Sequence, residues 1–172
     1  GCIGADSIDI VVNDVPVLLI TQPEAICQPG VVDLTNPQIT SGSSAGTLSY
    51  WTDADATAAL ANPSAVNVSG TYYIKLSSAD GCETIAPVVV NVLPRPVTSA
   101  ISGETTPLCE SEGIVYSVNP APTSNFQWSL QGLDGSSIVA GQGTAAIAVN
   151  FGSINGFLQV VQTGANGCVA ET

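Results

Sequence analysis

The chain has 172 residues, of which 14 are acidic and only two, Lys75 and Arg95, are basic, so its formal net charge is −12. Two cations cannot displace the counterions of a nucleic-acid backbone or hold an anionic lipid surface, so neither is an expected partner. The chain also lacks histidine. Ser-His-Asp and Cys-His nucleophile systems need an imidazole, so we expect no enzyme activity, and we expect no cofactor.

Alternating apolar residues predict short strands through the first half of the chain. The first of these is residues 7–13, where Ile8, Ile10 and Val12 fall on one face. Further strands are predicted at 16–21, 31–35, 48–52, 71–77 and 87–93.

Between two of these strands, Asp53 is followed by an alanine-rich stretch. This pattern predicts one or two helical turns over residues 53–60, with Asp53 as the cap. Asp53 and Asp55 also resemble the opening of a calcium loop. However, no glycine turn or distal glutamate follows them, so we favour helix capping and expect no metal site.

The second half repeats the strand pattern. Strands are predicted at 97–102, 114–119, 125–131, 136–140, 144–151 and 156–163. Asn155-Gly156 stands between the last two, and this dipeptide predicts a tight hairpin. No apolar run approaches the ~20 residues that span a bilayer, so membrane insertion is not expected.

The dipeptide Gly-Cys occurs at Gly1-Cys2, Gly81-Cys82 and Gly167-Cys168, at intervals of 80 and 86 residues. The remaining cysteines, Cys27 and Cys109, precede the second and third of these by 55 and 59 residues. Such self-similarity is typical of repeat proteins, which serve as spacers or binding rods more often than as enzymes.

The repeat phase predicts three segments. Residues 1–14 would be the last strand of a preceding repeat, residues 15–94 a complete domain, and residues 95–172 a domain that lacks its final strand. Pro94 and Pro96 would stiffen the linker between the two domains.

The repeated spacing predicts the disulfide pairs Cys27–Cys82 and Cys109–Cys168, with Cys2 pairing outside the segment. The alternative is five free thiols in a cytosolic protein. A bridge in each domain would contribute roughly 4 kcal/mol in the chain-entropy model and would require an oxidising compartment.

Short strands separated by Gly, Asn, Asp and Pro turns predict an all-β fold of tandem β-sandwich domains, each with one disulfide. Trp51 and Trp128 occupy comparable places in the two halves. We expect each to be buried near a disulfide. The alternative is an exposed tryptophan that stacks on sugars.

Several motifs resemble those of immunoglobulin-like and PKD-like repeats in large surface proteins of Bacteroidetes. In the first half they include Cys27-Gln28-Pro29-Gly30, Tyr50-Trp51, Ser69-Gly70-Thr71-Tyr72-Tyr73 and Asp80-Gly81-Cys82. In the second half they include Phe126-Gln127-Trp128, Gly141-Gln142-Gly143-Thr144, Val149-Asn150-Phe151-Gly152 and Asn166-Gly167-Cys168. The resemblance covers nearly the whole chain and implies the Ig-like or PKD-like sandwich for both halves.

The resemblance also implies export to the cell surface, often by type IX secretion, in an adhesin stalk or a gliding filament. The expected function is that of a structural spacer and interaction module. Its partners would be neighbouring repeats, laterally associated copies, and an unknown surface or glycan target.

The alternative function is a carbohydrate-binding module of a secreted polysaccharide-degrading system, with Tyr50, Trp51 and Tyr73 as a glycan platform. Asp6-Ser7-Ile8 is similar to the Bacteroidetes O-glycosylation pattern, which makes Ser7 a candidate modification site.

Overall fold

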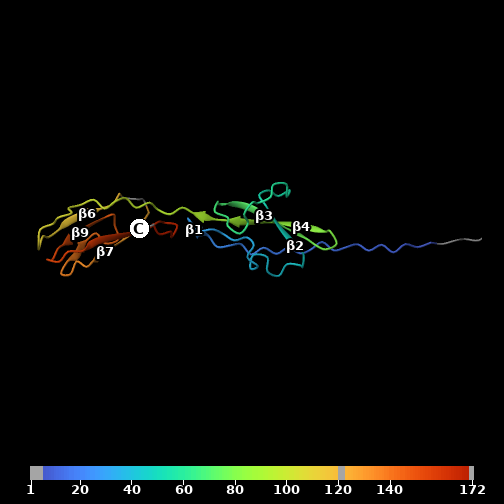
Figure 1. Cartoon of the computed structure of the whole chain (residues 1–172), viewed down its shortest axis with the longest axis horizontal. Coiled ribbons are helices and arrows are strands. Elements are labelled where there is room, and N and C mark those ends of the chain that lie inside the picture. Colours follow the sequence, from blue (N-terminus) through green and yellow to red (C-terminus); the bar gives the residue numbers. More distant parts are fainter. Residues whose placement is uncertain (1–5, 120–122, 171–172) are drawn as a thin grey trace, which may run out of the picture. The chain divides into compact units, whose positions relative to one another are not determined.

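The computed structural model describes residues 6–119 and 123–170, and its regular elements are β-strands (Figure 1). Two compact units divide the chain, Gly1–Val92 and Leu93–Thr172. Within the described residues, no helix is long and apolar enough to cross a bilayer. The predicted all-β class is confirmed, whereas the helical turns predicted at 53–60 are replaced by bends and turns.

Unit 1 is built around an antiparallel sheet in the order β2-β3-β4. Its strands are β2 (Thr47–Trp51), β3 (Gly70–Ser77) and β4 (Glu83–Val90). A short ladder joins β1 (Ile26–Cys27) to β5 (Val92–Leu93). The strands predicted at 48–52 and 71–77 are confirmed, and the one predicted at 87–93 begins four residues earlier.

The core of unit 1 follows from the period of two along these strands. Ile74 of β3 and Val88 and Val90 of β4 are fully buried, whereas Val89 between them is 42% exposed. The buried cluster also contains Val32, Leu34, Ile39, Val66 and Val92.

Three strands predicted in unit 1 do not form. Residues 16–21 run extended, but they bond to a neighbouring loop through scattered contacts, such as the Thr21 N–H to the Ile39 carbonyl at 2.8 Å. Residues 31–35 keep a single bridge, from Val32 to Val66. Residues 7–13 form no strand, their apolar side chains are exposed, and no strand among the described residues pairs with them (Figure 1).

Unit 2 contains two antiparallel sheets. One has the order β6-β9-β8, and the other pairs β7 with β10. The strands are β6 (Ile114–Ser117), β7 (Asn125–Gln131), β8 (Ser137–Ala140), β9 (Ala146–Asn150) and β10 (Phe157–Thr163). The predictions for these five strands are confirmed. The segment 97–102 provides only the bridge from Ser102 to Ser117.

Trp128 anchors the core of unit 2 and is 2% exposed. Its indole Nε1–H donates to the Thr144 carbonyl at 2.8 Å. Its main-chain N–H donates to Gln142 Oε1 at 3.0 Å, and Gln142 Nε2 donates to its carbonyl at 2.9 Å. The glutamine side chain therefore takes the place of a neighbouring strand at this edge of β7.

The hairpin predicted at Asn155-Gly156 is wrong. β9 pairs with β6 and β8, whereas β10 pairs with β7, so the chain crosses between sheets at this dipeptide. Gly156 is required here because a Cβ atom would overlap the Gln131 carbonyl oxygen. The sequence signal therefore marked a close backbone approach.

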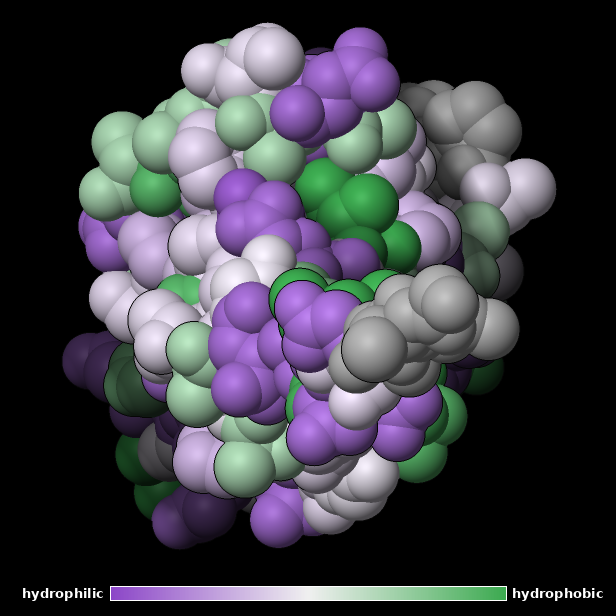
Figure 2. Space-filling view, turned by 90° about the vertical axis from the view of Figure 1, so that its right-hand side faces the viewer, coloured by the Kyte–Doolittle hydropathy of each residue, from purple (hydrophilic) through white to green (hydrophobic). Residues whose placement is uncertain are grey.

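The surface reflects the low content of charged residues. Figure 2 shows a face on which hydrophilic and weakly polar residues predominate, with small hydrophobic patches between them. Among the described residues, Lys75 Nζ forms an ion pair with Glu83 Oε1 at 3.1 Å. Exposed pairs of this kind contribute about 0–1 kcal/mol, so cohesion rests on apolar packing and hydrogen bonds.

The turn after β8 tests this packing. Gly141 has a φ of +83°, and a Cβ atom there would overlap the Ala146 carbonyl oxygen, whereas Gly143, with a φ of +90°, meets nothing within 4 Å. We expect Gly141→Ala to lower the free energy of unfolding by about 3 kcal/mol or more, from strain plus collision. Gly143→Ala should cost only about 1–2 kcal/mol. Urea denaturation followed by circular dichroism measures both, and equal losses would contradict the collision.

Candidate functional site

Each unit contains the same turn ending in Gly-Cys. In unit 1 the Ser78 N–H donates to the Cys82 carbonyl at 2.9 Å, and the Gly81 N–H donates to the Ser78 carbonyl at 3.1 Å. In unit 2 the Gly164 N–H donates to the Cys168 carbonyl, and the Gly167 N–H to the Gly164 carbonyl, both at 2.9 Å. Both glycines have positive φ, 85° and 80°. At Gly81-Cys82 and Gly167-Cys168 the sequence repeat is therefore also a repeat of backbone geometry.

The cysteines do not pair as predicted. Cys27 and Cys168 are disulfide-bonded, whereas Cys82 and Cys109 are free thiols. The structure therefore contradicts the pairs Cys27–Cys82 and Cys109–Cys168. Cys2 lies outside the described residues.

In unit 1 the reason is the length of β4. Cys82 precedes the first residue of β4, while Cys27 lies beside the chain that follows the strand, because the Ile26 N–H donates to the Asn91 carbonyl at 3.0 Å. Nine residues of extended chain cover about 30 Å. A disulfide requires Cα atoms within about 7 Å, so these two cysteines cannot meet.

The same geometry applies in unit 2 along β10. Cys109 lines a hollow together with Phe157, the first residue of β10. Cys168 bonds to Gly164, just beyond the last residue of that strand. Most of the strand, about 20 Å, therefore separates the two cysteines.

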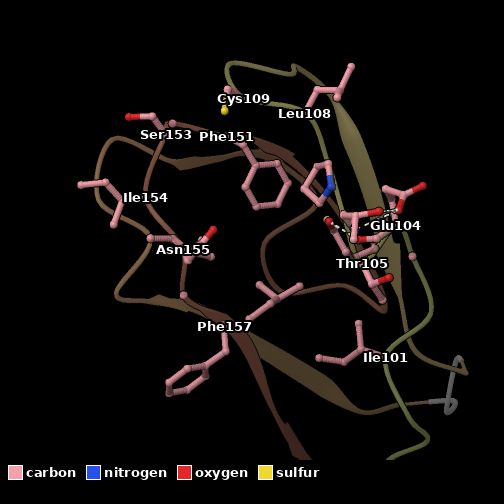
Figure 3. A pocket seen from close by; sticks show the side chains of 18 residues that line it. Ile101, Glu104, Thr105, Leu108, Cys109, Phe151, Ser153, Ile154, Asn155 and Phe157 are labelled. Atoms are coloured by element: carbon pink, nitrogen blue, oxygen red, sulfur yellow. Dashed lines mark hydrogen bonds between the residues drawn. The ribbon is translucent and has the colours of Figure 1, made fainter.

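The hollow that Cys109 lines is a groove in unit 2 with a volume of about 660 Å³. One wall is the segment 101–109, and the other is the segment 151–158, which includes the start of β10. Figure 3 shows the Phe151 ring pointing into the hollow, Ile101 on the opposite wall, and the Phe157 ring directed away. We refer to this hollow as the unit 2 groove.

Tyr116 and Phe151 form the inner part of the groove, with ring centroids 5.9 Å apart in an edge-to-face arrangement. The Tyr116 hydroxyl donates to the Glu104 carbonyl at 2.6 Å. Burial raises the pKa of Tyr116, and the Glu104 carboxylate adds to this rise. Hydrogen bonds from the Thr106 N–H and hydroxyl lower the pKa of Glu104. The inner part of the groove is thus apolar, and the Glu104 carboxylate places a negative charge at its rim.

The three residues predicted as a glycan platform do not share a face. Tyr50 packs against the core of unit 1. Trp51 lies on the other face of the sheet, where it is paired with Tyr73 of β3. Lys75 Nζ lies 5.4 Å from the Trp51 ring centroid, and the Trp51 indole N–H donates to Ser49 Oγ. Two rings and a cation occupy this face, so the three-residue platform is not formed.

Asp53 organises a loop, although the predicted helix is absent. Its carboxylate accepts hydrogen bonds from the main-chain N–H groups of Asp55, Thr57 and Ala58 and from the Thr57 hydroxyl. The backbone donors at Thr57 and Ala58 lower the pKa of Asp53. The acceptor role expected of a cap is therefore kept without the helix, and the carboxylate is directed at its own loop.

Ser7 is exposed, as a modification site requires, and its main-chain N–H donates to Asp6 Oδ1 at 2.9 Å. Its glycosylation stays a prediction. Among the described residues, no group of three or more His, Cys, Asp or Glu side chains could hold a metal ion.

Residues 94–172 match the family model of the PKD-like domain. The matched range covers unit 2 almost entirely. Among curated proteins, none matches the chain. PKD-like domains are typically extracellular and non-catalytic, and the disulfide bonding of Cys27 and Cys168 fits an oxidising environment. Unit 2 is therefore an Ig-like structural or interaction module.

Alkylation of the native protein tests the thiol assignment. Cys109 is exposed and Cys82 is half-buried, so iodoacetamide should label both without a reductant and should leave Cys27 and Cys168 unlabelled. Peptide mapping by mass spectrometry reads the result. A peptide that joins Cys27 to Cys82 would contradict the structure.

The Asp53 loop predicts a pH dependence. Because the folded pKa of Asp53 is lowered, its contribution to stability is present above the ordinary value of 3.8 and is lost as the pH falls through the folded value. Asp53→Asn should therefore destabilise the protein at neutral pH and differ less from the native protein at pH ~2–3. Thermal unfolding measures both differences. Asp55→Asn removes the same charge without removing the acceptor, so an equal effect from that variant would overturn the assignment.

Proposed function

We propose that this chain is a structural repeat segment of a long extracellular surface filament or adhesin stalk, in which it acts as a spacer and an interaction module. The observation that carries the proposal is the identical hydrogen-bonded Gly-Cys turn in the two units. Repetition of one backbone device at an interval of 86 residues, from Cys82 to Cys168, is what an array of similar sandwiches requires.

Two further observations support a role outside the cell. The PKD-like match is to a domain that is typically extracellular. The surface is also nearly free of cations, with Lys75 and Arg95 as the only basic residues of the chain. Such a surface suits contact with neutral glycans, proteins or other copies of the chain. Export by type IX secretion in a member of the Bacteroidetes belongs to the same proposal.

Mechanical resistance would come from the ladders and from bridged cysteines. β3 and β4 pair along their full length. Gly70 pairs with Val90 at one end of the ladder, and Ser77 pairs with Glu83 at the other. Both sheets of unit 2 enclose a tryptophan-centred core. In this proposal each sandwich carries load, and the proline-rich segment 94–96 limits bending between neighbours.

Surface labelling tests the proposal. Antibodies raised against the purified chain should decorate intact cells of the source organism in immunogold electron microscopy, with gold lying away from the outer surface. An antibody against a cytoplasmic enzyme is the control and should label only permeabilised cells. Labelling of the chain only after permeabilisation would overturn the proposed location.

A further inference from the structure

One edge of β7 has no strand beside it in the part of the chain that the structure describes. β10 pairs with β7 along the other edge, over all seven residues of the strand. Main-chain groups point to alternate edges along an antiparallel strand, so Phe126 and Trp128 direct theirs to the edge without a strand. Such an edge is a template on which an extended segment of another chain can pair.

The usual protections of an edge strand are absent from β7. Charged side chains, proline, bulges and short length commonly keep edge strands from pairing. β7 has seven residues in regular register with β10, and none of them is charged or a proline. Asp134 is the only charged residue between Gly113 and Ala170. By contrast, β8 at the edge of the other sheet has four residues and a register shift between Ile138 and Ala140.

The side-chain amide of Gln142 occupies the centre of the β7 edge. Its Oε1 accepts a hydrogen bond from the Trp128 N–H at 3.0 Å, and its Nε2 donates to the Trp128 carbonyl at 2.9 Å. Beside it, Gly143 forms a bridge to Phe126, so the turn that contains Gln142 covers both residues of this edge. The amide supplies one acceptor and one donor, as a neighbouring strand would. An approaching strand could therefore bond to Trp128 only by displacing Gln142.

A glutamine has the same role at an edge of unit 1. β3 pairs with β4 along one side. On the other side, Gln22 Oε1 accepts a hydrogen bond from the Val89 N–H at 2.7 Å, and Gln22 Nε2 donates to the Pro87 carbonyl at 3.4 Å. Gln22 precedes every strand of unit 1, whereas Gln142 lies between β8 and β9, so the two contacts do not arise from one repeated motif. Each unit therefore closes a strand edge with a side-chain amide of separate origin.

We propose that Gln142 and Gln22 keep the edges of β7 and β4 closed to strand addition, and that the partner they exclude is the same edge of a second copy of the chain. Two copies offer identical edges, so a two-fold pairing would join their sheets into one. The net charge of −12 does not prevent this, because at about 0.15 M salt charges are screened beyond about 8 Å and β7 itself carries none.

The inference goes beyond the proposed spacer role and does not depend on it. A spacer whose units stand close together in one chain exposes the same edges at high local concentration, so closed edges would keep neighbouring units separate. Association is measured in solution, and its outcome says nothing about the surface location. The two proposals can therefore fail separately.

Sedimentation velocity of the whole chain, with free thiols alkylated, tests the inference. Gln142→Met keeps the length of the side chain but removes its donor and its acceptor. This variant should raise the self-association constant about tenfold or more above that of the native chain, because two main-chain groups of Trp128 become available to a partner strand. Gln127→Met is the matched control. Gln127 is exposed on the same strand and faces away from the core, so this variant should associate no more than the native chain.

Two further variants separate edge pairing from a loss of stability. Gln142→Glu loses the donated hydrogen bond, but it keeps the acceptor and places a charge at the edge, so it should melt at a lower temperature without associating. Gln142→Met/Gln127→Lys places a lysine on the open strand and should return the association constant close to the native value. Gln22→Met applies the first test to β4 and does not depend on the packing of unit 2.

The expected pattern is thus association of Gln142→Met and Gln22→Met alone. The inference is refuted if Gln142→Met associates no more than Gln127→Met. It is equally refuted if Gln142→Glu associates as strongly as Gln142→Met, because association would then follow the loss of stability and not the open edge.

Discussion

The Gly-Cys turn is the constraint on which the arrangement of both units depends. Its two hydrogen bonds fix where the chain reverses, and a reversal fixes the register of the strand that follows. Because side chains alternate, a shift of one residue would turn Val88 and Val90 from the core to solvent. Glycine at positive φ makes the turn possible, so a backbone requirement at one residue decides the composition of a core many residues away.

The presence of a strand could be predicted from the sequence wherever apolar and polar residues alternated clearly and the fold buries one face of the strand and exposes the other. The strand at 125–131 was predicted to the residue. Alternation failed at 7–13 because a pattern states what a strand would bury, and whether a partner is present is a separate matter. Asn155-Gly156 failed because a dipeptide signals a permitted backbone shape, which a crossover between sheets can use as well as a hairpin.

The errors at the candidate sites share one physical origin. Spacing along the sequence states neither the face of the sheet on which a side chain lies nor the end of the strand at which a residue lies. Trp51 was matched to Trp128 by spacing, but Trp128 pairs with Val160 as Tyr50 pairs with Ile74, so Tyr50 is the structural counterpart. The match by spacing was therefore wrong by one residue, and Trp51 lies on the face of the sheet away from the core. The predicted disulfides were wrong because the two cysteines of each predicted pair lie at opposite ends of a strand, although their spacing in the sequence is similar in the two units. The unit 2 groove was not predicted, because its walls, the segments 101–109 and 151–158, lie far apart in the sequence and no motif marks their approach.

The excess of acidic residues has a consequence for where the protein could work. Copies that each carry a net charge of −12 repel one another in dilute solution, where the Debye length is about 30 Å at 0.01 M salt. At about 1 M salt this length falls to about 3 Å, so the repulsion then acts only between surfaces that nearly touch. Salt concentration therefore sets how closely this chain and another acidic surface can approach each other.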